Sequence, residues 1–129
     1  MNRMDLAIGW TFIVLGTLHN FVGAMHSPEL NPAALWFVSG GIALWLIGAM
    51  NLLRVYYGGV APGLRWVCLA ANLVVAAFSV TYAAVTGAWR RPLGILLLGT
   101  CAGAILMALL QPGVRPGAAD SSSHDDRRE

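Results

Sequence analysis

Four long apolar blocks constrain the fold of this chain more than any other feature of its sequence. They cover residues 4–25, 33–53, 64–85 and 93–110, and a length of about 20 residues is what a helix needs to cross a membrane. Hydrophobic residues make up 57% of the 129 residues and charged residues only 11%. A soluble domain of this size cannot bury four helices that are apolar on all sides. The sequence therefore predicts an all-α membrane protein, a four-helix transmembrane bundle.

The connections between the blocks predict how the bundle is organised. The first and third connections, 26–32 and 86–92, are short and contain turn residues, so we expect two antiparallel hairpins. The second connection, 54–65, is interpreted as a longer basic loop. Residues 1–111 then form one transmembrane domain. The polar composition of residues 112–129 predicts a disordered tail.

The distribution of arginine predicts the orientation, since all eight basic residues are arginine. On the side of the membrane that holds the N-terminus, four arginines lie near the membrane: Arg3, Arg54, Arg65 and Arg115. The opposite side has two, Arg90 and Arg91. The positive-inside rule then places both termini in the cytoplasm of a multi-pass protein of the bacterial inner membrane. A bias of four to two is moderate, and insertion in both orientations stays open. Because the arginines form no stripe, we expect no nucleic-acid partner.

Glycines form faces on which helices can approach each other closely. Three recur every seven residues in the first block, two in the second and two in a GxxxG pattern in the fourth. They are Gly9, Gly16, Gly23, Gly41, Gly48, Gly99 and Gly103. Small residues at such spacing are typical of interfaces between membrane helices. We expect Trp45 to lie against the glycines of the first helix. The remaining faces predict a homo-oligomer or a larger membrane complex within the lipid bilayer.

Counting 1.5 Å per residue from the predicted helix ends brings polar residues of all four helices to one depth in the outer leaflet. With Trp36 at the mouth, these residues are His19, Asn20, Trp36, Ser39, Ser79, Tyr82 and Thr100. Polar side chains in hydrocarbon need partners and tend to face the bundle interior. In one interpretation they satisfy one another and determine the register of the helices. In the other they line a pocket that opens outward and binds a small lipophilic ligand.

A second candidate site combines His19 with the pair His26 and Glu29. Imidazole and carboxylate together can transfer protons near neutral pH, and the three side chains could also ligate a metal ion. Ser27 and Pro28 interrupt the helix between the pair, so i,i+3 geometry is not expected. We therefore predict an interfacial histidine and a solvated glutamate, with no metal and no cofactor.

Three classes of function fit these features. The first is a non-enzymatic integral membrane protein, either a subunit or a binder of a small lipophilic ligand in the outer-leaflet pocket. The second is a membrane enzyme that acts on an isoprenoid-like or quinone-like substrate, with His19, His26 and Glu29 as acid–base groups and with Asn20 and Tyr82 orienting the substrate. The third is a small oligomeric transporter. Abundant glycine faces and few ionisable residues within the blocks favour the first.

Overall fold

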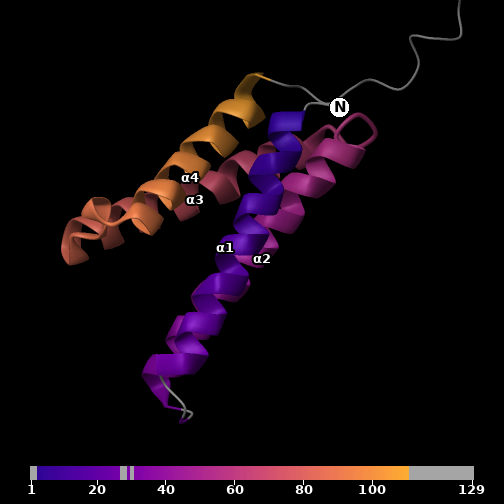
Figure 1. Cartoon of the computed structure of the whole chain (residues 1–129). Coiled ribbons are helices and arrows are strands. Elements are labelled where there is room, and N and C mark those ends of the chain that lie inside the picture. Colours follow the sequence, from indigo (N-terminus) through magenta and orange to yellow (C-terminus); the bar gives the residue numbers. More distant parts are fainter. Residues whose placement is uncertain (1–2, 27–28, 30, 111–129) are drawn as a thin grey trace, which may run out of the picture.

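A computed structural model of the chain describes residues 3–26, 29 and 31–110. The helices are α1 (Arg3–His26), α2 (Pro32–Tyr57), α3 (Gly63–Thr86) and α4 (Pro92–Leu110), with the short 3-10 helix η1 (Ala88–Arg90) before α4 (Figure 1). The described residues contain no strand. All four long helices have the length and composition to cross a membrane. The prediction of an all-α chain with four such helices is therefore confirmed, and the predicted tail, 112–129, lies outside the described residues.

The second helix begins and ends where local chemistry allows it. The Asn31 side chain accepts a hydrogen bond from the backbone N–H of Ala34 at 2.8 Å, and Pro32 occupies the first turn. Proline suits that position because the first N–H groups of a helix have no partner within it. At its other end α2 continues to Tyr57, so Arg54 is helical and the predicted loop over 54–65 is too long.

Glycines hold α1 and α2 together along most of their length. The close pairs are Gly9 with Gly48, Gly16 with Gly41, and Gly23 with Phe37. Residue numbers rise along α1 from one close pair to the next while they fall along α2, so the two helices run in opposite directions. A Cβ atom placed on Gly16 would lie 2.7 Å from the carbonyl oxygen of Gly41. The two backbones therefore meet at a distance that leaves no room for a side chain.

Trp45 completes this interface, as the sequence predicts. Its Cδ1 atom would lie 2.6 Å from a Cβ atom on Gly16. Its indole N–H donates hydrogen bonds to the carbonyl of Ile13 at 3.1 Å and to the hydroxyl of Thr17 at 3.0 Å. The prediction that Trp45 lies against the glycine face of α1 is confirmed.

Replacing Trp45 by phenylalanine tests the contribution of these hydrogen bonds. The ring is largely kept but the N–H donor is lost, so we expect the free energy of unfolding to fall by about 1 kcal/mol. The free energy of unfolding is measured in mixed micelles by raising the fraction of a denaturing detergent. Trp10→Phe is the matched control because Trp10 is exposed. Equal losses in both variants would contradict the assignment.

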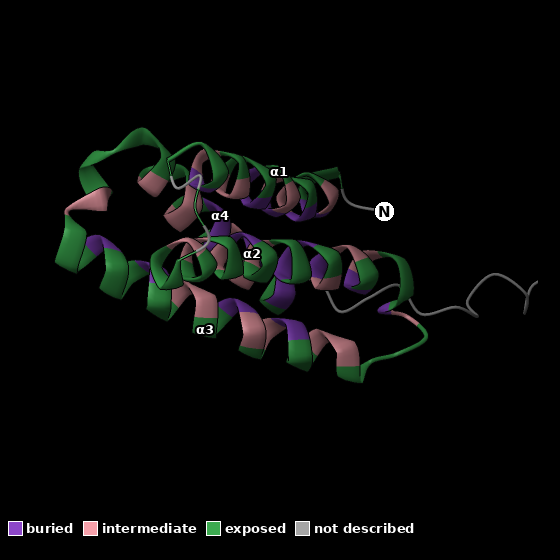
Figure 2. Cartoon of the chain, turned by 90° about the horizontal axis from the view of Figure 1, so that it is seen from below, coloured by how far each residue is buried: buried purple, intermediate pink, exposed green. Residues whose placement is uncertain are grey.

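The two helix pairs, α1 with α2 and α3 with α4, meet mainly toward the end that carries the N-terminus. There Phe12, Ile47, Cys101 and Ala104 form the apolar core. We call this end of the molecule the N-terminal end. The opposite end, at which α1 and α3 finish and α2 and α4 begin, is called the far end. No residue of 32–40 or 92–99 is buried, and Figure 2 shows the buried residues on the inward faces of the helices. In Figure 1 the far ends of the two pairs diverge.

Candidate functional site

The imidazole of His19 is the central feature of the predicted outer-leaflet site. It lies flat on the ring of Phe37, with ring centroids 3.9 Å apart and an interplanar angle of 2°. Its Nε2 atom would be 3.1 Å from a Cβ atom on Gly40, so glycine at that position leaves room for the ring. His19 is half-buried in this arrangement.

The position of this stack along the helices shows which way it faces. His19 follows Phe12 by seven residues, and Gly40 precedes Ile47 by seven. Residues seven apart return to nearly the same face of a helix. Phe12 and Ile47 belong to the same core cluster as Cys101 and Ala104 of α4. The stack of His19 on Phe37 therefore lies on the side of the first pair that is turned toward the second pair, where the two pairs diverge.

Asn20 lies next to His19 but points into the interface between α1 and α2. Its side-chain amide contacts the backbone of Gly41. The Oδ1 atom is buried and accepts no hydrogen bond from any described residue. A buried acceptor without a donor costs about 1–3 kcal/mol. Asn20 is therefore a polar group that the described part of the chain leaves unsatisfied.

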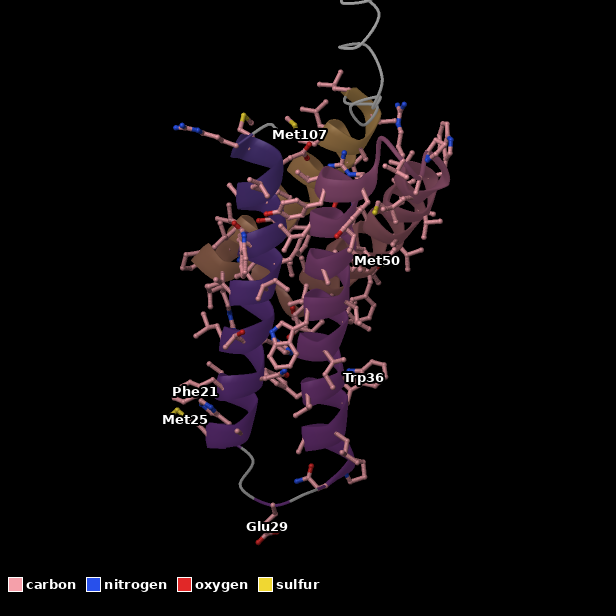
Figure 3. All side chains as sticks on the ribbon, turned by 90° about the vertical axis from the view of Figure 1, so that its right-hand side faces the viewer. Phe21, Met25, Glu29, Trp36, Met50 and Met107 are labelled. Atoms are coloured by element: carbon pink, nitrogen blue, oxygen red, sulfur yellow. The ribbon has the colours of Figure 1, made fainter. Side chains whose placement is uncertain are left out.

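Two further predicted site residues, Trp36 and Ser39, lie on the outside of the first pair. Trp36 is 72% exposed and points away from the other helices in Figure 3. The Ser39 hydroxyl donates to the Trp36 carbonyl at 2.7 Å and is exposed as well. Neither side chain contributes to the site around His19.

The remaining members of the predicted layer belong to the second pair. Ser79 and Thr100 are buried, whereas Tyr82 is 53% exposed. The Thr100 hydroxyl donates to the carbonyl of Leu96 in its own helix. Among the described residues, no hydrogen bond or ring contact joins these three residues to His19 or its neighbours in the first pair. The structure thus divides the predicted layer into two groups, one on each pair.

The second candidate site is spread along the far end of α1. His26 is exposed, and its Nδ1 atom donates to the carbonyl of Val22 at 3.0 Å. Glu29 is exposed in the connection that follows, away from the helices in Figure 3. Within residues 3–26, 29 and 31–110, no three His, Cys, Asp or Glu side chains form a group that could hold a metal ion.

The most strongly buried polar groups lie at the N-terminal end, where the sequence predicts no site. Asp5 and Arg54 are each 4% exposed, and Asn51 and Asn72 are 1% and 0% exposed. Arg54 Nη2 donates to Asp5 Oδ1 at 2.5 Å, which joins α1 to α2. The Nε atom of Arg54 is buried without a partner among the described residues. The charges of Asp5 and Arg54 therefore compensate each other, although both side chains are shielded from water.

Two asparagines join α2 to α3 in the same region. Asn51 and Asn72 exchange amide hydrogen bonds of 2.9 and 3.0 Å, and Asn51 also donates to the carbonyl of Ile47. One turn nearer the N-terminal end, the Cys68 thiol donates to the carbonyl of Met50 at 3.2 Å. Reciprocal amide bonds satisfy both side chains without solvent, and a fully satisfied buried network holds its members in one arrangement.

The sequence contains a signal for this polar cluster of Asp5, Asn51, Arg54 and Asn72. Asn51 and Arg54 are spaced i,i+3 and so share a helix face. The prediction of a loop over 54–65 places Arg54 outside the helix that contains Asn51. Asp5 then has no basic partner on a neighbouring helix and is interpreted as an acid at the membrane boundary. A buried arginine next to a buried asparagine calls for an acid on a neighbouring helix, and Asp5 is the acid of the first block.

The two regions differ in what they can do chemically. At the N-terminal end the charges neutralise each other and the amides satisfy each other, which stabilises the junction of the helices. At the far end, the half-buried ring of His19 lies against Phe37 and Gly40, with one ring N–H bonded to the backbone of Phe37 and the other nitrogen left as an acceptor. Comparison with known proteins adds no family assignment, since no family model, curated protein or solved structure matches this chain.

Proposed function

We propose that this chain is a non-enzymatic, multi-pass protein of the bacterial inner membrane that binds a small lipophilic molecule between the far halves of its two helix pairs. The pairs are two antiparallel hairpins with both termini in the cytoplasm, so the far end lies in the outer leaflet. The observation that carries the proposal is the stack of His19 on Phe37, on the face turned toward the second pair. A polar ring held flat at this place is suited to orient a ligand.

The surroundings of His19 define the class of ligand. Leu15 and Leu44 lie on the same faces of α1 and α2, and Leu44 and Leu97 of α4 pack against the neighbouring core. Ligand sites are commonly apolar with a few placed polar groups that determine orientation. A neutral imidazole has one N–H donor and one acceptor nitrogen. Because the N–H of the His19 ring is bonded to the backbone of Phe37, the remaining ring nitrogen is an acceptor. The chemistry therefore fits an apolar molecule with a single hydroxyl group, as in an isoprenoid alcohol.

The glycine faces favour a binder over a subunit of a larger complex. Gly9, Gly16, Gly23, Gly41 and Gly48 all make close contacts between α1 and α2, which uses them within the chain. Gly103 approaches the side chain of Ile8 on α1. Of the seven glycines that the sequence offers for oligomerisation, Gly99 is the one without a neighbour within 4 Å of an added Cβ atom.

Native mass spectrometry of the gently extracted protein tests the proposal. We expect wild-type protein to carry a bound lipophile and His19→Leu to bind it about tenfold more weakly, since a hydrogen bond of about 1.4 kcal/mol corresponds to a factor of ten in affinity. His26→Leu is the matched control, because His26 is exposed and bonds only its own helix. Equal occupancy in both variants, or an empty wild-type protein, would refute the binding site.

A further inference from the structure

We infer that the two helix pairs rock against each other about the Asn51–Asn72 amide pair, which opens and closes the space between their far halves. The movement concerns the protein without a ligand, so it goes beyond the proposed function. It requires that each pair moves as a unit, that the contact between the pairs is confined to one end, and that the connection between them can bend. Each requirement corresponds to an observation.

Each helix pair is tied together at more than one level. The first pair is joined by glycine contacts from Gly9 to Gly23. In the second pair, Arg65 donates to the carbonyls of Ala108 and Leu109, both at 2.7 Å, at the N-terminal end. At the far end of that pair, the short connection that contains η1 joins α3 to α4, and Gly94 of α4 packs on the backbone of Ala88 within this connection. Links at both ends keep α3 and α4 together when the pair tilts.

The contacts between the pairs are concentrated toward the N-terminal end. The Asn51–Asn72 bonds and the bond from Cys68 to Met50 cross from one pair to the other at this end. The apolar contacts there place large residues of the first pair, Phe12 and Ile47, against Ala104 of α4, and Ile8 against Gly103. Small residues let the helices of the two pairs approach closely at this end.

The connection between the pairs contains the elements of a hinge. Residues 58–62 join α2 to α3 and include Gly58, Gly59 and Pro62. A few residues at the ends of helices can absorb the backbone changes of a hinge movement. Far from this connection, residues 32–40 and 92–99 contain no fully buried residue, and of these residues Leu97 packs half-buried against the core. Closure would bring the far halves of the two pairs toward each other.

Distance measurements between spin labels test the movement in lipid nanodiscs without added lipophile. Labels at Val22→Cys and Leu93→Cys, with Cys68→Ser and Cys101→Ala to remove the native thiols, report the separation of the far halves. We expect two populations about 10 Å apart, which is the displacement that a tilt of about 23° gives at the far end, about 25 Å from the asparagines at about 1.5 Å per residue. One narrow distance would overturn the inference.

A matched pair of labels within one helix pair provides the control. Met25→Cys and Leu35→Cys lie near the far ends of α1 and α2, and both positions are exposed. This pair should give a single narrow distance, and two populations here would show that the first pair is not a rigid unit. Replacing both Asn51 and Asn72 by leucine should change the ratio of the two populations, and an unchanged ratio would exclude the amide pair as the pivot.

A photoreactive residue at position 22 provides a second measurement that keeps the native cysteines. In the closed arrangement we expect it to crosslink to residues 92–99, and peptide mass spectrometry identifies the product. Failure to crosslink there would contradict closure even if the cysteine-free variants did not fold. Because no ligand takes part, failure of the movement and failure of the proposed binding site remain distinguishable.

Discussion

Replacing Arg54 by methionine is expected to lower the free energy of unfolding by about 3–5 kcal/mol, the usual cost of breaking a buried ion pair. Methionine keeps most of the apolar length of the side chain but leaves the carboxylate of Asp5 without its partner. Asp5 is only 4% exposed, so water cannot replace the lost guanidinium without a rearrangement of α1. The loss reflects the unpaired charge more than the value of the pair itself.

Unfolding in mixed micelles, followed by helical circular dichroism, measures this effect. Arg90→Met is the control, because Arg90 is exposed and is expected to change stability by less than about 0.5 kcal/mol. The double variant Asp5→Leu with Arg54→Met should recover most of the loss, since an apolar pair can replace an ion pair at little cost. Equal losses in the single and double variants would show that the charge of Asp5 is not the cause.

Replacing Gly16 by valine is expected to have the second largest effect, a loss of about 1–3 kcal/mol or more from overpacking. An added Cβ atom would lie 2.6 Å from Cδ1 of Trp45 and 2.7 Å from the carbonyl oxygen of Gly41. The indole can move, but the carbonyl belongs to the backbone of α2. The two helices must therefore separate, which also weakens the hydrogen bonds from Trp45 to α1.

Gly99→Ala is the matched control for this prediction. Nothing lies within 4 Å of a Cβ atom at that position, and alanine favours a helix over glycine by up to about 1 kcal/mol. Unfolding of both variants under the same conditions is the measurement. We expect Gly99→Ala to be neutral or stabilising and Gly16→Val to be destabilising. A loss at Gly99 as large as that at Gly16 would contradict the open position of Gly99.

The sequence by itself determines the helices and one of their interfaces. Blocks of about 20 apolar residues, bounded by residues such as Pro32 and Gly87, specify four helices because their backbone groups must bond within each helix in hydrocarbon. The heptad spacing of the glycines of α1 and the place of Trp45 between two glycines are also local in sequence. They predict the α1–α2 interface, and the structure confirms the contact of Trp45 with Gly16.

Only the tertiary structure decides which polar groups meet. Counting along helices assigns a depth to each residue, and it brings His19, Ser79 and Thr100 to one level. Whether residues of equal counted depth touch depends on the tilt and rotation of each helix. In the structure Ser79 and Thr100 lie beside Cys101 of the core, whereas His19 lies seven residues beyond Phe12, toward the far end where the two pairs diverge. At the N-terminal end the helices converge, so Asp5 meets Arg54 across 49 positions of the chain. Tilt and rotation arise from the contacts of all helices together, and for this reason no single segment of the sequence contains them.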